Sequence, residues 1–451
     1  MKNQIIRKHI LSGSALIGFL VLSANSFGAN WLTLQGTEPE GAEQLAKVWG
    51  FIQVQYQDDA SDPNGAGGYI PPKLIAPNWQ SQSAFNINRA RIGVRGVAMP
   101  LDQKINYFVL VEVGNNAITE PENSVTKATD ASVTFNHIKG ARVRAGLFKY
   151  PSGEESMAAI HVHDYINFSW VSGQMLLERF PNGTYTPNNP PQPIPPEIPF
   201  NGFDRGVGAY RDVGVQVFDW FNVGNNWELS YAVMTGNGNG LNFSDNDDNK
   251  DLYALVTAEK VFGGKGPRRQ GLKFFAWSQS GIRTADLTND DTFNPVEYDR
   301  DRYGFGFKYL RNGLRATVEY MAGEGMIWQA PHNPSFGIGP GQGNPAAPGN
   351  GAFAEGQGYY VEGGWRIPKS RWELDLRYDE YNRLDGDRFQ IDFKRTTLGA
   401  QYFFNPRVRL AINYEIREGN APNFPAGAGP NGNVDGIDNR IALQVTAIWS
   451  Q

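Results

Sequence analysis

Residues 85–96 read FNINRARIGVRG, and the fold depends on how this stretch is interpreted. In an extended strand, alternate side chains point to opposite faces. Arg89, Arg91 and Arg95 therefore share one face, and the other face is apolar. A soluble sheet would turn the arginines to water, whereas a membrane barrel would turn the apolar row to lipid and the arginines to an aqueous lumen. This strand alone does not decide between the two.

The spacing between such strands favours the membrane barrel. Segments of about ten residues with period-two hydrophobicity recur along the chain. The short connections between them are residues 99–103, 137–140, 221–226, 262–271, 310–313, 367–370 and 404–407. The long connections are residues 58–84, 114–128, 150–206, 235–250, 280–297, 322–357, 380–392 and 417–439. Because the two kinds alternate strictly and join about 16 strands, we expect an all-β fold, a transmembrane antiparallel β-barrel with short periplasmic turns and long extracellular loops.

The start of the chain predicts export. Lys2, Arg7 and Lys8 precede an apolar run over residues 10–22, and small residues follow it, as in a cleaved secretory signal. A membrane anchor is the alternative, but serines and glycines interrupt the run. We therefore predict a signal peptide over residues 1–29, a short periplasmic segment over 30–46 and an outer-membrane barrel over 47–451. The third long loop, residues 150–206, has the length to fold into the pore.

Composition and motifs exclude several classes of function. The chain has no cysteine, so it has neither a disulfide framework nor a thiolate metal site. Its net charge of −5 disfavours a nucleic-acid partner. No G-x-S-x-G, H-E-x-x-H or Walker pattern occurs, and we expect no enzyme, no cofactor and no metal. His161 and His163 could supply two metal ligands, but we interpret them as a polar pair in a loop.

Five segments resemble a known family. They are RARIGVRG (89–96), RAGLFKYPSGEE (144–155), WELDLRYDEY (372–381), TLGAQYFFNPRVRLAINYE (397–415) and RIALQVTAIW (440–449). In this order and spacing they resemble the phosphate-selective porin O and P family of Gram-negative outer membranes. The resemblance implies a trimeric porin of about 16 strands that passes anions such as phosphate, with Arg89, Arg91, Arg144 and Lys149 near its basic lining. The chain departs from that family in having one cation, Arg179, between residues 151 and 199.

The faces opposite the apolar rows are predicted to line the lumen. From this alternation and from the resemblance, the predicted pore-lining cations are Arg89, Arg91, Arg95, Arg142, Arg144, Lys149, Arg300, Arg302, Lys308, Arg395 and Arg409. The alternation adds Lys104, Arg315, Arg371, Arg377, Arg407 and Arg440, and it predicts more cations than carboxylates toward the lumen. Fixed guanidinium charges suit an anion path. The alternative is that the arginines pair with carboxylates on neighbouring strands and brace the wall, and the sequence leaves both open.

The sequence therefore predicts an outer-membrane porin for passive diffusion of small solutes, with a preference for anions such as phosphate. One alternative is a barrel sleeve that holds a partner such as a multihaem cytochrome. Another is an outer-membrane hydrolase, for which no cluster of nucleophile, base and acid is recognisable. The expected partners of the porin are further copies in a homotrimer, outer-membrane lipid with lipopolysaccharide, and small anionic solutes.

Overall fold

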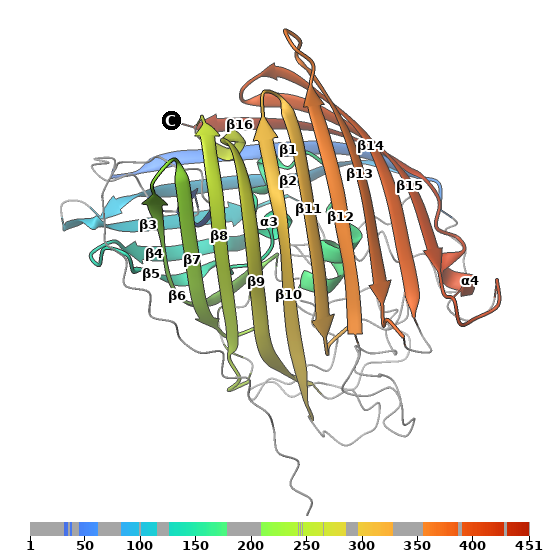
Figure 1. The fold of residues 1–451 in the computed structure, drawn as a ribbon, viewed down its shortest axis with the longest axis horizontal. Helices are drawn as coiled ribbons and strands as arrows, with labels where there is room; N and C mark the ends of the chain where they lie inside the picture. The colour runs from blue at the N-terminus through green and yellow to red at the C-terminus, as the bar shows by residue number, and fades with distance from the viewer. Residues whose placement is uncertain are drawn as a thin grey trace, which may run out of the picture.

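Sixteen strands close into one antiparallel barrel in the part of the chain that the structure describes (Figure 1). The structure is a computed structural model, and it describes residues 31–34, 37, 45–61, 83–98, 101–114, 126–177, 209–241, 243, 245, 247–264, 266–285, 296–327, 355–386, 390–427 and 431–450. Each strand pairs with its neighbours in sequence, and β1 pairs with β16 to close the ring. The prediction of an all-β transmembrane barrel of about 16 strands is confirmed.

The strands are β1 (Lys47–Asp59), β2 (Ser83–Ala98), β3 (Asp102–Glu112), β4 (Lys127–Phe135), β5 (Arg142–Lys149), β6 (Arg211–Val223), β7 (Trp227–Gly236), β8 (Asp251–Gly263), β9 (Gln270–Ala285), β10 (Val296–Arg311), β11 (Leu314–Glu324), β12 (Glu355–Arg366), β13 (Trp372–Arg383), β14 (Ile391–Asn405), β15 (Val408–Asn420) and β16 (Arg440–Ser450). The short helical elements are α1 (Trp31–Leu34), α3 (Glu154–Met157), η1 (Ile160–Val162), η2 (Ser172–Leu176), η3 (Gly266–Arg268) and α4 (Asn431–Val434). None of these described helices is long and apolar enough to cross a membrane.

The short connections lie where the sequence predicts them, and their residues suit tight turns. Between β10 and β11, Asn312 and Gly313 have φ values of 53° and 83°. A two-residue hairpin of type I′ needs positive φ at both central positions, which Asn-Gly tolerates well. This local chemistry fixes the register that pairs Arg311 with Leu314 and sets which side chains of both strands face inward.

The stretch FNINRARIGVRG lies within β2. Phe85, Ile87 and Ile92 are exposed on the outside of the barrel, whereas Arg89 and Arg91 are buried. The register between β1 and β2 shifts at Gln53, so that one residue of β2 is extra at this point. Such a bulge changes the alternation by one residue. Two consecutive residues, Asn88 and Arg89, are therefore buried at the bulge. After the bulge the alternation resumes, and Arg91 is buried on the same inner face.

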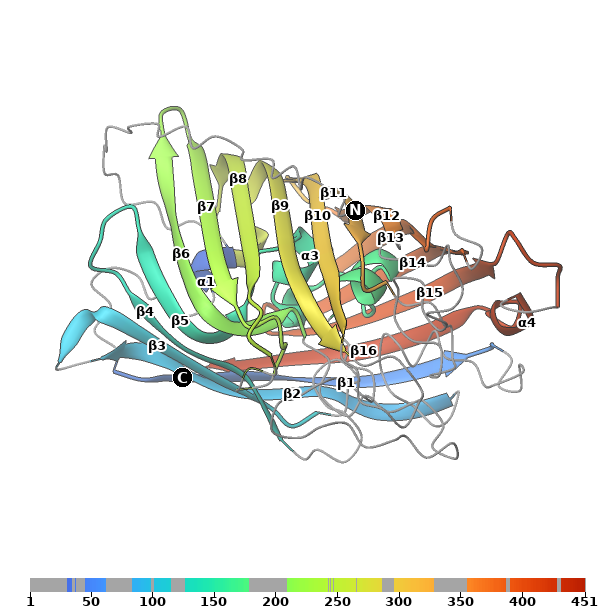
Figure 2. The same cartoon turned by 90° about the horizontal axis from the view of Figure 1, so that it is seen from below.

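The interior of the barrel is filled by its own chain. Figure 2 shows α1 and α3 inside the ring of strands. One apolar cluster joins inward aromatic side chains of the strands, such as Tyr381 and Phe393, to Trp170, Val171 and Leu176 of the segment after β5. The core therefore lies in the middle of the barrel, between residues 150–177 and the inner wall.

Candidate functional site

The inner wall is charged and the outer wall is apolar, as β13 illustrates. Trp372, Leu374 and Leu376 are 40%, 47% and 54% exposed on the outside. The residues between and after them, Glu373, Asp375, Arg377 and Asp379, are buried on the inside. This is the alternation of a barrel whose outside meets hydrocarbon and whose inside meets polar groups.

The segment after β5 lies against the inner wall on the opposite side of the barrel. The backbone N–H of Trp170 donates to Asp379 Oδ1 at 2.6 Å, and Asn167 Nδ2 donates to Glu415 Oε1 at 2.9 Å. Arg395 Nη2 in turn donates to the carbonyl of Phe168 at 2.5 Å. The described part of the predicted third loop, residues 150–177, therefore sits within the barrel. Residues 178–206 of that loop lie outside the described residues.

Four predicted pore-lining cations form ion pairs. Arg91 pairs with Glu112 at 2.7 Å, and Arg142 pairs with Asp219 at 3.2 Å. Lys308 pairs with Glu154 at 2.9 Å, and Arg395 pairs with Asp379 at 2.9 Å. Their charges are largely compensated, so these side chains brace the wall as the alternative interpretation predicts.

Four more predicted cations donate to backbone carbonyls. Arg95 Nη2 contacts the carbonyl of Thr37 at 3.0 Å, and Arg144 Nη2 contacts that of Leu32 at 2.8 Å. Near the long-loop end, Arg300 Nη2 contacts the carbonyl of Leu176 at 3.0 Å. Arg302 Nε contacts that of Met175 at 3.1 Å. These arginines hold residues 31–37 and 172–177 in place.

The remaining three predicted cations, Arg89, Lys149 and Arg409, form what we call the basic cluster. Arg89 Nη1 donates to Gln53 Oε1 at 3.1 Å. Lys149 Nζ donates to the carbonyls of Ser156 and Ala158, each at 2.7 Å. Arg409 Nη1 donates to Gln401 Oε1 at 2.6 Å, and its Nη2 contacts the carbonyl of His163. All these acceptors are neutral, and none of the ion pairs among the described residues includes a member of the cluster.

The basic cluster surrounds the loop residues 158–163. Lys149 and Arg89 both lie within electrostatic reach of His163, and Lys149 and Arg409 within reach of His161. All three cations are buried, so their fields are screened less than those of surface charges. The arrangement brings cations of β2, β5 and β15 around this part of the loop, and Asp164 at its edge offsets part of the charge of Arg409.

The two histidines are uncharged members of this site. Burial, together with the nearby Arg409, Arg91 and Lys149, lowers the pKa of His161 to about 3. Burial and Lys149 also lower the pKa of His163 well below its usual value. His161 packs on Phe51 with ring centroids 4.9 Å apart, and His163 meets Phe168 edge-on at 5.1 Å. The rings thus pack against aromatic side chains, and within the described residues no group of three or more His, Cys, Asp or Glu side chains has the arrangement of a metal site.

A second group of charges, on β11 to β16, is neutralised more fully, and we call it the paired network. Arg315 lies 2.6 Å from Asp375 and 3.1 Å from Asp164. Arg377 lies 3.2 Å from Glu155. Glu415 bridges Arg395 at 3.4 Å and Arg440 at 2.6 Å. The network thus joins β11, β13, β14, β15 and β16 to carboxylates of the loop.

The balance of charge differs from the sequence prediction. Among the described residues, buried carboxylates match buried lysines and arginines in number, whereas the alternation predicts an excess of cations. The difference arises because the loop brings Glu154 and Glu155 inside and because acidic residues such as Asp251 and Glu259 face inward. Lys104, Arg371 and Arg407, predicted to face the lumen, are exposed at the short-turn end. These three are therefore not among the buried charges of the interior, and their lumenal position stays a prediction.

The alternation in the sequence did not predict some residues that are buried inside the barrel. Arg211, Arg383 and Arg417 are buried inside the barrel. Arg211 and Arg383 lie at strand ends next to long loops, where an alternating pattern is shortest. Arg417 lies in the continuation of the β15 row through Arg409 and Glu415, and extending that row by one step would have found it.

Comparison with known proteins shows the fold alone. No family model and no curated protein matches this chain. Among solved structures, the loop L8 deletion mutant of OmpT, an outer membrane protein of Vibrio cholerae, is 9% identical, with 90% of this chain and 99% of that chain covered and a TM-score of 0.51. In-vitro folded OmpT of Vibrio cholerae is 10% identical, with coverage of 91% and 100% and a TM-score of 0.50. The outer membrane channel DcaP of Acinetobacter baumannii is 11% identical, with coverage of 90% and 97% and a TM-score of 0.49.

Proposed function

We propose that this protein is a porin of a Gram-negative outer membrane, exported by a cleaved signal peptide, through which small hydrophilic solutes diffuse passively. The observation that carries the proposal is the inside-out distribution of side chains over a closed barrel. Apolar stripes such as Trp372, Leu374 and Leu376 face outward, and ionic side chains face inward. Hydrocarbon solvates the first set, and water and ions suit the second.

We propose further that the channel has a weak preference for anions. The support is the basic cluster, because the hydrogen-bond acceptors of Arg89, Lys149 and Arg409 are neutral oxygens rather than carboxylates. Arginine and lysine side chains can replace part of the water around a passing anion. Phosphate is the anion that the resemblance to phosphate-selective porins implies. The preference is expected to be weak, since the paired network cancels most of the remaining lumenal charge.

Reversal potentials in a planar bilayer test both parts of this proposal. The purified mature chain is inserted into a neutral bilayer, and the reversal potential is measured across a KCl gradient. We expect discrete conductance steps and a potential of the sign that chloride permeation gives. A potential of the cation-selective sign would remove the anion preference. The absence of any conductance from folded protein would remove the channel itself. Adding inorganic phosphate to one side then tests that anion, which should reduce the chloride current if it binds in the lumen.

The homotrimer remains a proposal from the family resemblance. Its measurement is the native mass of the protein in detergent, where a mass of one chain would contradict it. We do not propose the sleeve for a multihaem cytochrome, because residues 150–177 occupy the described interior that a partner would need.

A further inference from the structure

The start of the described chain lies inside the barrel. Trp31 and Leu32 are 7% and 1% exposed, and both belong to the interior apolar cluster. Thr37 is 7% exposed. The sequence places these residues in a periplasmic segment. In the structure α1, which begins with Trp31 and Leu32, lies inside the ring of strands beside α3 (Figure 2).

Contacts of this segment begin on one wall of the barrel. The Tyr107 hydroxyl on β3 donates to the carbonyl of Leu45 at 2.5 Å. Arg95 on β2 donates to the carbonyl of Thr37 at 3.0 Å. Arg144 on β5 donates to Thr37 Oγ1 at 3.1 Å and to the carbonyl of Leu32 at 2.8 Å. Inside the barrel, β2 and β5 of this wall therefore anchor Leu32 and Thr37, while Tyr107, on the outward row of β3 with Val109, holds Leu45.

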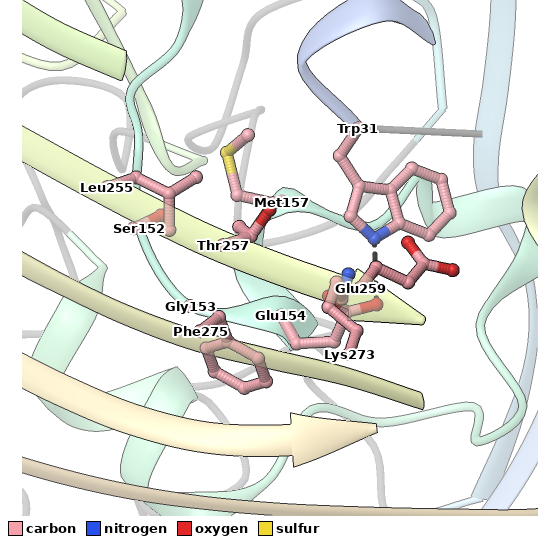
Figure 3. A pocket seen from close by; sticks show the side chains of 10 residues that line it. All are labelled: Trp31, Ser152, Gly153, Glu154, Met157, Leu255, Thr257, Glu259, Lys273 and Phe275. Atoms are coloured by element: carbon pink, nitrogen blue, oxygen red, sulfur yellow. Dashed lines mark hydrogen bonds and ion pairs between the residues drawn. The ribbon is translucent and has the colours of Figure 1, made fainter. Parts of the chain in front are cut away.

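The contacts end near the opposite wall. Trp31 Nε1 donates to Glu154 Oε1 at 2.8 Å (Figure 3). Glu154 also pairs with Lys273 of β9 and, at 2.9 Å, with Lys308 of β10. The Lys308 ammonium lies 5.6 Å from the centre of the Trp31 ring. Since β2 and β10 lie half a turn apart in the strand order, the segment crosses the lumen.

The crossing lies toward the short-turn end. Lys308 is on β10 close to the turn at Asn312 and Gly313, and Arg95 is on β2 close to its end at Ala98. Residues 150–177 reach the same region from β5, whose end at Lys149 leads into the long loop. The two segments meet at Glu154. Trp31 and the residues after it narrow the lumen on one side of Glu154, and residues 150–177 narrow it on the other.

Packing around this meeting point is close. Trp31, Glu154, Glu259, Lys273 and Phe275 line a cavity of about 20 Å³ (Figure 3), which has room for a water molecule. Burial opposes ionisation of Glu154, but Lys273 and Lys308 outweigh it and lower the pKa of this carboxyl. A charged acceptor strengthens the hydrogen bond from the Trp31 indole.

We propose that Trp31, Leu32 and Thr37 form a second constriction of the channel, which sets the upper size of the solutes that pass its short-turn end. The inference rests on the proposed channel function. Its physical basis is that a packed tryptophan and its hydrogen-bonded backbone occupy cross-section that water and solute would otherwise fill.

Conductance of matched tryptophan variants tests this proposal. Trp31→Ala removes both the ring and the indole donor, and removal of residues 31–37 from the mature chain removes the whole crossing. We expect single-channel conductance to rise by at least about twofold in the second case and by less in the first, because conductance follows open cross-section. Swelling of protein-loaded liposomes in neutral sugars should extend to larger sugars. Trp372→Ala, on the lipid side of β13, is the control and should leave both readings unchanged.

The outcomes separate this proposal from the channel function. Unchanged conductance and sugar cut-off in folded protein lacking residues 31–37, with the parent chain conducting, would overturn the second constriction only. Absence of conductance in both chains would overturn the channel function.

Thiol labelling gives an answer even if the shortened chain does not fold. The protein has no cysteine, so Thr37→Cys and Leu45→Cys each introduce a single thiol. Thr37 is 7% and Leu45 56% exposed. A membrane-impermeant maleimide should therefore react at position 45 at least about tenfold faster, because reaction requires an accessible thiolate. Equal rates in the folded protein would contradict the buried position of Thr37 and with it the proposal.

Discussion

The basic cluster and the paired network use the same kinds of side chain for different purposes. In the network, Arg315 and Arg395 each contact carboxylates from more than one element. In the cluster, Arg89 and Lys149 contact amide and carbonyl oxygens. A buried cation next to a carboxylate is neutralised and braces the wall, whereas one held by carbonyl or amide oxygens has no countercharge in direct contact. The nature of the acceptor, more than the number of arginines, therefore indicates which part of the lumen attracts anions.

The largest expected effect comes from breaking the paired network. Glu415→Gln removes the carboxylate that pairs with Arg440, which stays buried, and one of the two carboxylates of Arg395, which keeps Asp379. Leaving a buried cation without its partner costs about 3–5 kcal/mol. We expect the free energy of unfolding from lipid vesicles to fall by that amount in urea titrations.

Glu418→Gln, three residues further along β15 and exposed, is the matched control. Exposed substitutions of this kind change stability by no more than about 0.5 kcal/mol. Equal effects of the two substitutions would show that the network does not stabilise the barrel.

A smaller effect concerns pH and the histidines inside the basic cluster. Burial and the neighbouring cations lower the pKa of His161 to about 3, while an unfolded histidine has a pKa of about 6.5. Between these values the unfolded state binds a proton that the folded state does not, so stability falls as pH decreases. The slope per histidine is about 1.4 kcal/mol per pH unit.

His161→Asn should reduce this slope between pH 6 and about 4, measured by the same urea titrations. His137→Asn, at the short turn after β4 and partly exposed, serves as the control. A slope that is the same in both variants would mean that His161 becomes protonated inside the barrel.

The smallest expected effect is that of salt concentration, which should change the anion preference given by the basic cluster but not the stability given by the paired network. Raising KCl from about 0.1 M to about 1 M shortens the Debye length from about 10 Å to about 3 Å. Anion preference from the basic cluster should weaken over this range, and the reversal potential should move toward zero at constant gradient ratio. The stability loss from Glu415→Gln should change little, because its ion pairs are buried and close. A salt-independent reversal potential would argue against a long-range field from the cluster.

The barrel wall could be predicted from the sequence because each strand and each turn is specified by residues that are close together in the chain. The alternation of apolar and polar residues over a short stretch decides which side of β13 meets lipid. The regular order of short and long connections decides the topology. The bulge at Asn88 is the kind of feature that alternation misses, although here it left Arg89 and Arg91 on the predicted side.

The interior of the site could not be predicted in the same way. Trp170 and its acceptor Asp379 are 209 residues apart, and Trp31 and its acceptor Glu154 are 123 residues apart. Neither segment has a repeating pattern that signals burial, because each packs against several strands at once. Some of the acceptors that distinguish the basic cluster from the paired network, such as the carbonyls of Ser156 and Ala158 and the carboxylate of Glu155, come from the segment after β5, so residue type alone could not separate the two regions.

The most direct test of this account is the reversal potential of the triple variant Arg89→Gln, Lys149→Gln, Arg409→Gln beside that of Arg407→Gln. Arg407 is exposed at the short-turn end, two residues before Arg409, and its substitution removes one charge from the region without changing the basic cluster. We predict that the triple variant loses the anion-selective sign of the potential while Arg407→Gln retains it. An unchanged anion-selective potential in the folded triple variant would contradict the assignment of selectivity to the basic cluster.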